Sequence, residues 1–171
     1  NKEFARRNMA FDPNKHSNLA ATFLGTTIPA NTPGAAALNT AMNTLFNHPN
    51  TAPFFCKQMI QRLVTSNPSP AYVGRVAAAF ANNGAGVRGD LKAVWSAILL
   101  DPEARAVSAP TTPGFGKLRE PIVRFVQWGR SFGFNSASGG WKMFETSSAS
   151  EKLGQSPLRS PSVFNFFRPG F

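Results

Sequence analysis

The chain has 171 residues, which is enough for one well-buried domain or for part of a larger one. Apolar residues make up 42% of it, whereas its single cysteine excludes an internal disulfide and a multi-cysteine metal cluster. The net charge of +10 favours an anionic partner, but the scattered placement of Lys and Arg argues against nucleic acid. No run reaches the roughly 18 consecutive apolar residues of a membrane span, and no export-signal pattern opens the chain.

Four segments carry apolar residues at the spacing of an amphipathic helix. They cover residues 34–47, 51–65, 70–83 and 90–100. A capping residue followed by proline marks three helix starts, at Thr32-Pro33, Ser69-Pro70 and Asp101-Pro102. The connectors are short, which favours antiparallel neighbours.

A short helix near residues 101–106 precedes a proline- and glycine-rich loop and then a fifth amphipathic helix. This helix is predicted to run from about Leu118 to Phe132, with Gly133 as its stop. Its apolar face should hold Leu118, Ile122, Phe125, Val126 and Phe132, and its other side Arg119, Glu120, Arg124 and Arg130. Residues 135–150 predict a loop with a short turn around Trp141 and Phe144.

No segment shows the alternation of a strand, so the predicted fold is all-α. We expect residues 1–171 to form a single helical domain, an antiparallel array of five to seven helices with short connectors rich in Pro and Gly. The irregular tail GQSPLRSPSVFNFFRPGF carries Phe164, Phe166 and Phe167. So apolar a segment should pack on the helices, continue into further residues, or act as a docking element.

The stretch FANNGAGVRGD matches the G-x-G-x-x-G pattern of dinucleotide-binding loops through Gly84, Gly86 and Gly89. That pattern binds a pyrophosphate only between a strand and a helix, with an acidic residue about twenty positions later. Here the preceding segment has helical periodicity, so the glycines are interpreted as a helix stop and a loop. The sequence predicts no cofactor.

Asp12 and His16 are the only weak catalytic candidates, because a carboxylate can orient an imidazole at this separation. Two such ligands do not form a zinc site, and no metal is predicted. His48 fits a turn before the second helix better than a catalytic role. Cys56 lies on an apolar stripe, which indicates a buried structural thiol rather than a nucleophile.

The segments FDPNKHSNLAATFLG, LFNHPNTAPFFCKQMIQRLVTSNPSPAYVGRVAAAF and RGDLKAVWSAILLDPEAR, with the Phe-rich tail, resemble domain-of-unknown-function family 1800 from bacteria. The resemblance runs from about Phe11 to Phe171. It implies the C-terminal part of a longer, exported protein whose gene often lies beside one for a secreted sulfatase-like partner. The family often has His-Asp where this chain has His16-Ser17, which weakens a catalytic role carried over to this site.

The sequence favours a helical binding or scaffold module that acts with a partner protein or an anionic polymer. Its candidate binding residues are three arginines of the fifth helix and three tail phenylalanines: Arg119, Arg124, Arg130, Phe164, Phe166 and Phe167. The first alternative is a hydrolytic enzyme whose site is completed by N-terminal residues absent here. The second is a non-specific nucleic-acid binder.

Overall fold

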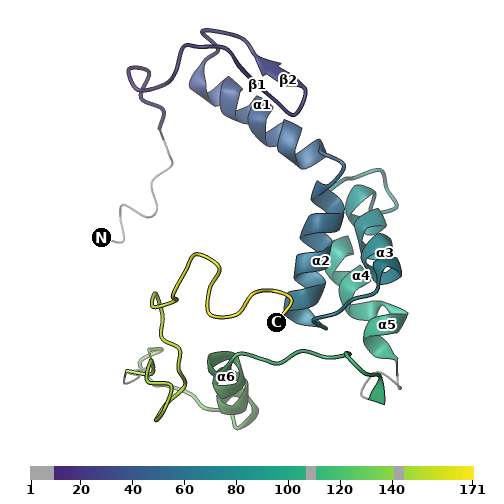
Figure 1. Cartoon of the computed structure of the whole chain (residues 1–171), viewed down its shortest axis with the longest axis vertical. Helices are drawn as coiled ribbons and strands as arrows, with labels where there is room; N and C mark the ends of the chain where they lie inside the picture. The colour runs from purple at the N-terminus through teal and green to yellow at the C-terminus, as the bar shows by residue number, and fades with distance from the viewer. Residues whose placement is uncertain (1–9, 107–110, 141–144) are drawn as a thin grey trace. The chain divides into compact units, whose positions relative to one another are not determined.

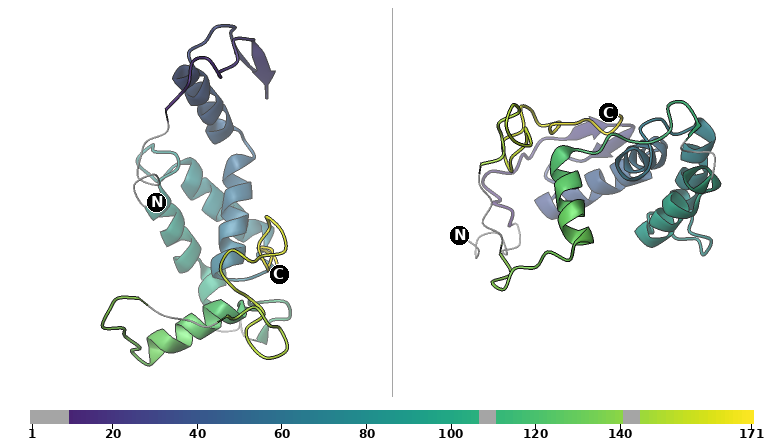
Figure 2. Two further views of the ribbon diagram at one scale, coloured as in Figure 1. Left: turned by 90° about the vertical axis from the view of Figure 1, so that its left-hand side faces the viewer. Right: turned by 90° about the horizontal axis from the view of Figure 1, so that it is seen from below.

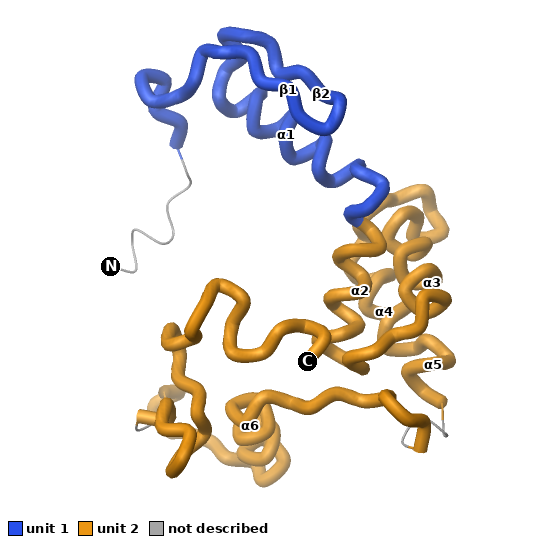
Figure 3. Tube along the Cα trace, viewed as in Figure 1, with its two compact units in different colours: residues 1–51 blue, residues 52–171 orange. Residues whose placement is uncertain are grey.

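The computed structural model describes residues 10–106, 111–140 and 145–171, and its secondary structure is mostly helical (Figure 1). The all-α prediction is confirmed, and the described residues form six helices and one two-stranded sheet. The chain divides into two compact units, residues 1–51 and residues 52–171 (Figure 3). The predicted turn around Trp141 and Phe144 lies outside the described residues.

The first unit contains a small β-hairpin that the sequence analysis did not predict. Strands β1 (Ala21–Phe23) and β2 (Thr26–Ile28) pair antiparallel, with Thr22 opposite Thr27. Each strand has three residues, which is too short to show the alternation by which a strand is recognised. Leu24 and Gly25 form the turn, and both have a positive φ, of 48° and 77°. A two-residue turn of this hand matches the twist of the paired strands.

Helix α1 (Gly34–Asn47) follows the hairpin, as the periodicity predicts. The expected Thr32 cap is wrong: Pro33 occupies the N-cap position, and the Thr32 hydroxyl donates to the carbonyl oxygen of Pro29 instead. The helix has no buried residue. Its Thr44 hydroxyl donates to the Thr26 hydroxyl at 3.1 Å, which ties the hairpin to the helix.

The core lies in the second unit, among helices α2 (Thr51–Leu63), α3 (Pro70–Ala81), α4 (Leu91–Leu100) and the short α5 (Pro102–Arg105). Figures 1 and 2 show α2, α3 and α4 side by side. Their buried apolar residues form one cluster: Ala52, Cys56, Ile60, Tyr72, Val76, Phe80, Val94 and Ile98. These positions recur every four residues within each helix, so each helix presents one stripe to its neighbours. Leu63, the last residue of α2, is 52% exposed.

Two of the three predicted helix starts are confirmed. Ser69 caps α3 through a hydrogen bond from the Tyr72 N–H, and Asp101 caps α5 through one from the Glu103 N–H. Both caps precede a proline in the first turn, whose fixed φ suits a helix start. The short helix predicted near residues 101–106 is α5.

The fifth predicted helix is α6 (Pro121–Ser131), which starts three residues later than expected. Pro121 sets the start, because proline is tolerated in the first turn of a helix and not in its interior. Gly133 stops the helix as predicted: its φ is +66°, and the Phe134 N–H donates to the Gly129 carbonyl oxygen. The tail after α6 has no helix or strand among its described residues.

Candidate binding site

The glycine loop between α3 and α4 is closed by its own asparagines. The Asn82 side-chain oxygen accepts from the N–H groups of Gly84 and Gly86, at 2.8 and 2.9 Å. The Asn83 side-chain oxygen accepts from the N–H groups of Ala85 and Val87. A phosphate would need such N–H groups free. A helix, not a strand, precedes these glycines, and they lie in a loop, as interpreted. The helix itself ends before them, because Asn82, two residues before Gly84, is its C-cap.

The first turn of α4 is likewise occupied. Asp90 accepts from the N–H groups of Lys92 and Ala93, and its other carboxylate oxygen accepts from the Asn83 side chain at 2.8 Å. The Asn83 hydrogen bond, with the N–H groups of the helix, lowers the pKa of Asp90. The position where a helix start would attract an anion already holds a carboxylate of the chain itself.

The structure gives Asp12 and His16 different partners. Asp12 accepts from the Asn14 N–H and lies 3.6 Å from the ammonium of Lys15. The His16 ring nitrogen Nε2 lies 3.2 Å from the Thr32 carbonyl oxygen. Among the described residues, no group of three or more His, Cys, Asp or Glu side chains is arranged to hold a metal. The described contacts give the imidazole no carboxylate to orient it.

The other two single candidates are structural, as the sequence indicates. Nδ1 of His48 accepts from the Asn50 N–H, which places the ring in the turn before α2. Cys56 is fully buried in the core, and desolvation raises the pKa of its thiol to about 11. So high a pKa leaves almost no nucleophilic thiolate at neutral pH.

A half-buried ion-pair network joins α3 to α5, and the sequence analysis did not identify it. Arg75 donates to both carboxylate oxygens of Asp101 at 2.7 Å. Glu103 accepts from the backbone and the hydroxyl of Ser69. The Arg75 hydrogen bonds lower the pKa of Asp101, whose side chain is almost fully buried. Desolvation raises the pKa of the nearby Tyr72 to about 12. All of these groups are satisfied within the chain, so the network stabilises the fold.

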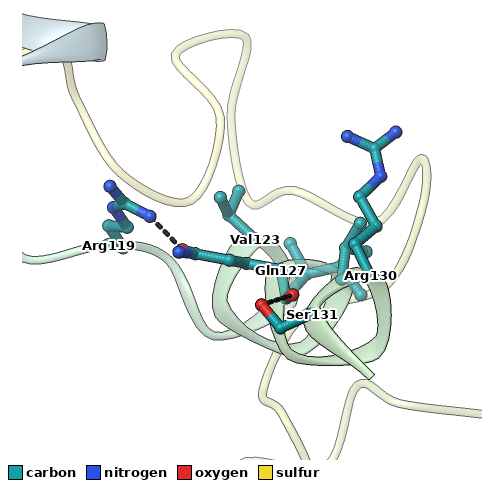
Figure 4. A pocket seen from close by; sticks show the side chains of 7 residues that line it. Arg119, Val123, Gln127, Arg130 and Ser131 are labelled. Carbon is teal, nitrogen blue, oxygen red and sulfur yellow. Dashed lines mark hydrogen bonds between the residues drawn. The ribbon is translucent and has the colours of Figure 1, made fainter. Parts of the chain in front are cut away.

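Helix α6 differs from the core helices because none of its residues is buried. One side lines a groove of about 540 Å³, together with Arg119 just before the helix. The lining residues are Arg119, Ile122, Val123, Val126, Gln127, Arg130 and Ser131. Figure 4 shows the two arginines at opposite ends, with Val123 and Gln127 between them.

The arginines of this region are available to a partner. Arg119 donates to the Gln127 side-chain oxygen, which orients its guanidinium along the groove (Figure 4). Arg124 and Arg130 are exposed, and none of the three arginines has an ion pair among the described residues. Guanidinium groups are the residues of choice for binding carboxylates, since they match them with two parallel hydrogen bonds.

The opposite side of α6 is aromatic. Trp128 contacts three rings, with centroid distances of 6.1 Å to Phe125, 5.5 Å to Phe132 and 4.9 Å to Phe134. All four rings are at least 42% exposed. Phe125, predicted to face a core, and Arg124, predicted to lie opposite it, line the same surface hollow of about 430 Å³. The predicted division of α6 into an inner and an outer face is therefore wrong: both sides carry apolar groups and both are exposed.

The start of α6 is fixed by a second polar network that sequence reasoning missed. Glu120 accepts from Arg62 at 3.3 Å and from the side chain of Gln155 at 2.8 Å. The Gln155 side-chain oxygen accepts from the Ile122 N–H, so one buried carboxamide holds both the acid and the helix. Gln155 lies thirty-five residues after Glu120 in an irregular segment, and no spacing pattern links the two. Glu120, predicted on an exposed side, is instead the N-cap residue of α6, and its carboxylate is held by Arg62 and Gln155.

The three candidate phenylalanines of the tail have different environments. Phe166 lines a small pocket with Glu120 and Gln155, and Phe167 is partly buried. Phe164 is 62% exposed beneath the guanidinium of Arg168.

The end of the tail is anchored by its backbone. The Phe171 carbonyl oxygen accepts from the Ser66 hydroxyl and from the ammonium of Lys117. Desolvation lowers the pKa of Lys117. The end of the tail is therefore held against Ser66 and Lys117 of the same unit. Of the three candidates, Phe164 is the one most available to a partner.

A family model described as a protein of unknown function, DUF1800, matches residues 1–171. No curated protein and no solved structure matches the chain. Within the described residues, no helix has the length and apolar character needed to cross a membrane.

Proposed function

The chain belongs to the DUF1800 family of proteins of unknown function, and on that premise we propose that it is a binding module for an acidic partner protein. The observation that carries the proposal is α6, an eleven-residue helix with no buried residue. It presents aliphatic and aromatic side chains between arginines that have no acidic partner among the described residues. Trp and Arg are the residue types that most often dominate the energy of protein interfaces.

The groove indicates the chemistry of the partner. Ile122, Val123 and Val126 supply an apolar floor, and Arg119 and Arg130 supply one cation at each end. A segment with apolar side chains and carboxylates at both ends would satisfy all of these groups. The aliphatic floor favours a protein segment over an anionic polysaccharide, because a sugar chain has few apolar groups to bury against it.

The proposed setting follows from the family resemblance. We place the protein outside the cytoplasm, as the resemblance implies, and take a secreted sulfatase-like protein, the partner that the resemblance implies, as the first partner to test. The exposed Phe164 of the tail is a second contact in this proposal. The hydrolytic alternative receives no support from the described contacts of Asp12 and His16.

Binding of a purified secreted sulfatase-like protein from the same organism to the whole chain tests the proposal. The double variant Arg119→Ala/Arg130→Ala should weaken binding at least about tenfold, and Trp128→Ala should do the same. Arg105→Ala is the matched control, since this exposed arginine lies on α5, away from the groove residues. It should leave the dissociation constant unchanged.

Two results would contradict the proposal. Equal losses in the Arg105 control would show that only net charge matters, and the effect would then disappear with added salt. Binding of an acidic polysaccharide such as alginate, with no binding of the protein, would replace the proposed partner by a polymer.

A further inference from the structure

One stretch of this basic protein has no charged side chain. Between Lys15 and Lys57 the sequence contains no Lys, Arg, Asp or Glu. The hairpin β1–β2 and helix α1 are built entirely from this stretch. In a chain with a net charge of +10, the surface of this part of the first unit is therefore electrically neutral.

The neutral surface is also apolar. Leu38, Met42 and Leu45 follow one another at the i, i+4, i+7 spacing that places side chains on one side of a helix. Each of them is at least 42% exposed. The hairpin contacts α1 on the side of Thr44, through the Thr26–Thr44 hydrogen bond, and leaves these three side chains exposed. We call Leu38, Met42 and Leu45 the uncharged face.

We infer that the uncharged face is the surface through which two copies of this chain associate. Two copies that met through their basic surfaces would repel each other, because the charge of +10 is carried outside this stretch. The uncharged face brings no like charges together. In a two-fold arrangement the same stripe of α1 meets its own copy, as a symmetric dimer requires.

The composition of the stretch favours a second copy over a lipid surface. Surface-binding helices hold the membrane with Lys or Arg on their polar side and with Trp or Tyr at the interface. Between Lys15 and Lys57 there is no Trp or Tyr and no basic side chain other than His16 and His48. Leucine and methionine against the same groups of a copy need none of these anchors.

A single introduced thiol tests the arrangement directly. Cys56 is fully buried, so in Met42→Cys the new thiol is the one exposed on the folded chain. Under mild oxidation the whole chain should form a disulfide-linked dimer, since Met42 lies at the centre of the face. Asn43→Cys is the matched control: it is exposed and one position on, about 100° around the helix. It should cross-link far less.

Sedimentation of the unmodified chain gives the second measurement. It should show a monomer–dimer equilibrium that Met42→Lys shifts to monomer, with at least a tenfold increase in the dissociation constant. A monomer at the highest soluble concentration, or equal cross-linking by the two cysteine variants, would overturn the inference. Binding to neutral lipid vesicles without self-association would also overturn it and would assign the face to a membrane. None of these results depends on α6, so this inference and the proposed function can fail separately.

Discussion

Helices α2–α5 and helix α6 have the same kind of sequence but very different environments. Both regions repeat apolar residues at helical spacing, yet the first provides all eight residues of the buried apolar cluster and α6 contributes none. The charged residues differ in the same way. Arg75 binds two acids, whereas Arg124 and Arg130 have no acidic partner among the described residues. Periodicity thus predicts a helix, but it does not say whether the apolar stripe is covered by the chain itself.

The difference between α2–α5 and α6 should be largest in the stability loss caused by shortening an apolar side chain. Ile98→Ala in α4 should lower the free energy of unfolding by about 2–5 kcal/mol, because a fully buried side chain leaves a cavity among its neighbours. Val126→Ala in α6 should change it by less than about 0.5 kcal/mol, because that side chain is 44% exposed. Denaturant unfolding of the two variants measures both values. Equal losses would show that α6 is as well packed as the core.

The second largest difference is expected between the ion pairs of the two regions, in how much each contributes to the free energy of unfolding. Asp101→Asn keeps a capping side chain on α5 but breaks the charge pair with Arg75, and should cost about 1–3 kcal/mol. The exposed pair Arg159–Glu145 after α6 should contribute little to the free energy of unfolding. Glu145→Gln should therefore leave the unfolding midpoint unchanged. Urea titrations at neutral pH compare the two variants. A larger loss in Glu145→Gln would reverse the assignment of the structural pair.

The same pair predicts a pH dependence. The Arg75 hydrogen bonds hold the pKa of Asp101 below its ordinary value in the folded chain. Its contribution is therefore complete above the unfolded pKa of about 3.9 and is lost as the pH falls through the lower folded pKa. Stability measured from pH 6 downward should fall more steeply in the parent chain than in Asp101→Asn. If stability falls with pH equally steeply in both chains, protonation of Asp101 does not contribute to acid unfolding.

The smallest predicted effect concerns two helical glycines. Alanine gains about 0.5–1 kcal/mol over glycine in a helix, and neither Gly74 in α3 nor Gly129 in α6 has an obstacle closer than 3.4 Å to an added methyl group. Gly74→Ala should raise the global free energy of unfolding by that amount. Gly129→Ala should instead slow amide exchange in α6 alone, because α6 is not part of the buried cluster. If Gly129→Ala instead raises the global free energy of unfolding, α6 unfolds together with the core helices.

The sequence predicts the helices well because their signals are local. Ser69-Pro70, Asp101-Pro102 and the Gly133 stop each act within a few residues, and the structure confirms all three. The hairpin was missed because three residues are too few for an alternating pattern. The Glu120–Gln155 hydrogen bond and the Arg75–Asp101 pair were missed because their partners lie far apart along the chain. For the candidate site, the sequence names Arg119, Arg124 and Arg130, whose binding role stays a prediction, but it does not indicate the aromatic side beside Arg124.

The buried thiol of Cys56 can be used to measure how often the core opens. Because burial raises the pKa of this thiol to about 11, almost no folded molecule holds a thiolate at pH 7, and the sulfur is shielded from solvent. An unfolded chain exposes a thiol with an ordinary pKa near 8.5 and therefore reacts much faster. The rate at which a thiol reagent labels the native protein therefore follows how often α2 opens away from α3 and α4. The native cysteine therefore reports the opening of the core, and no dye or engineered label is needed to measure it.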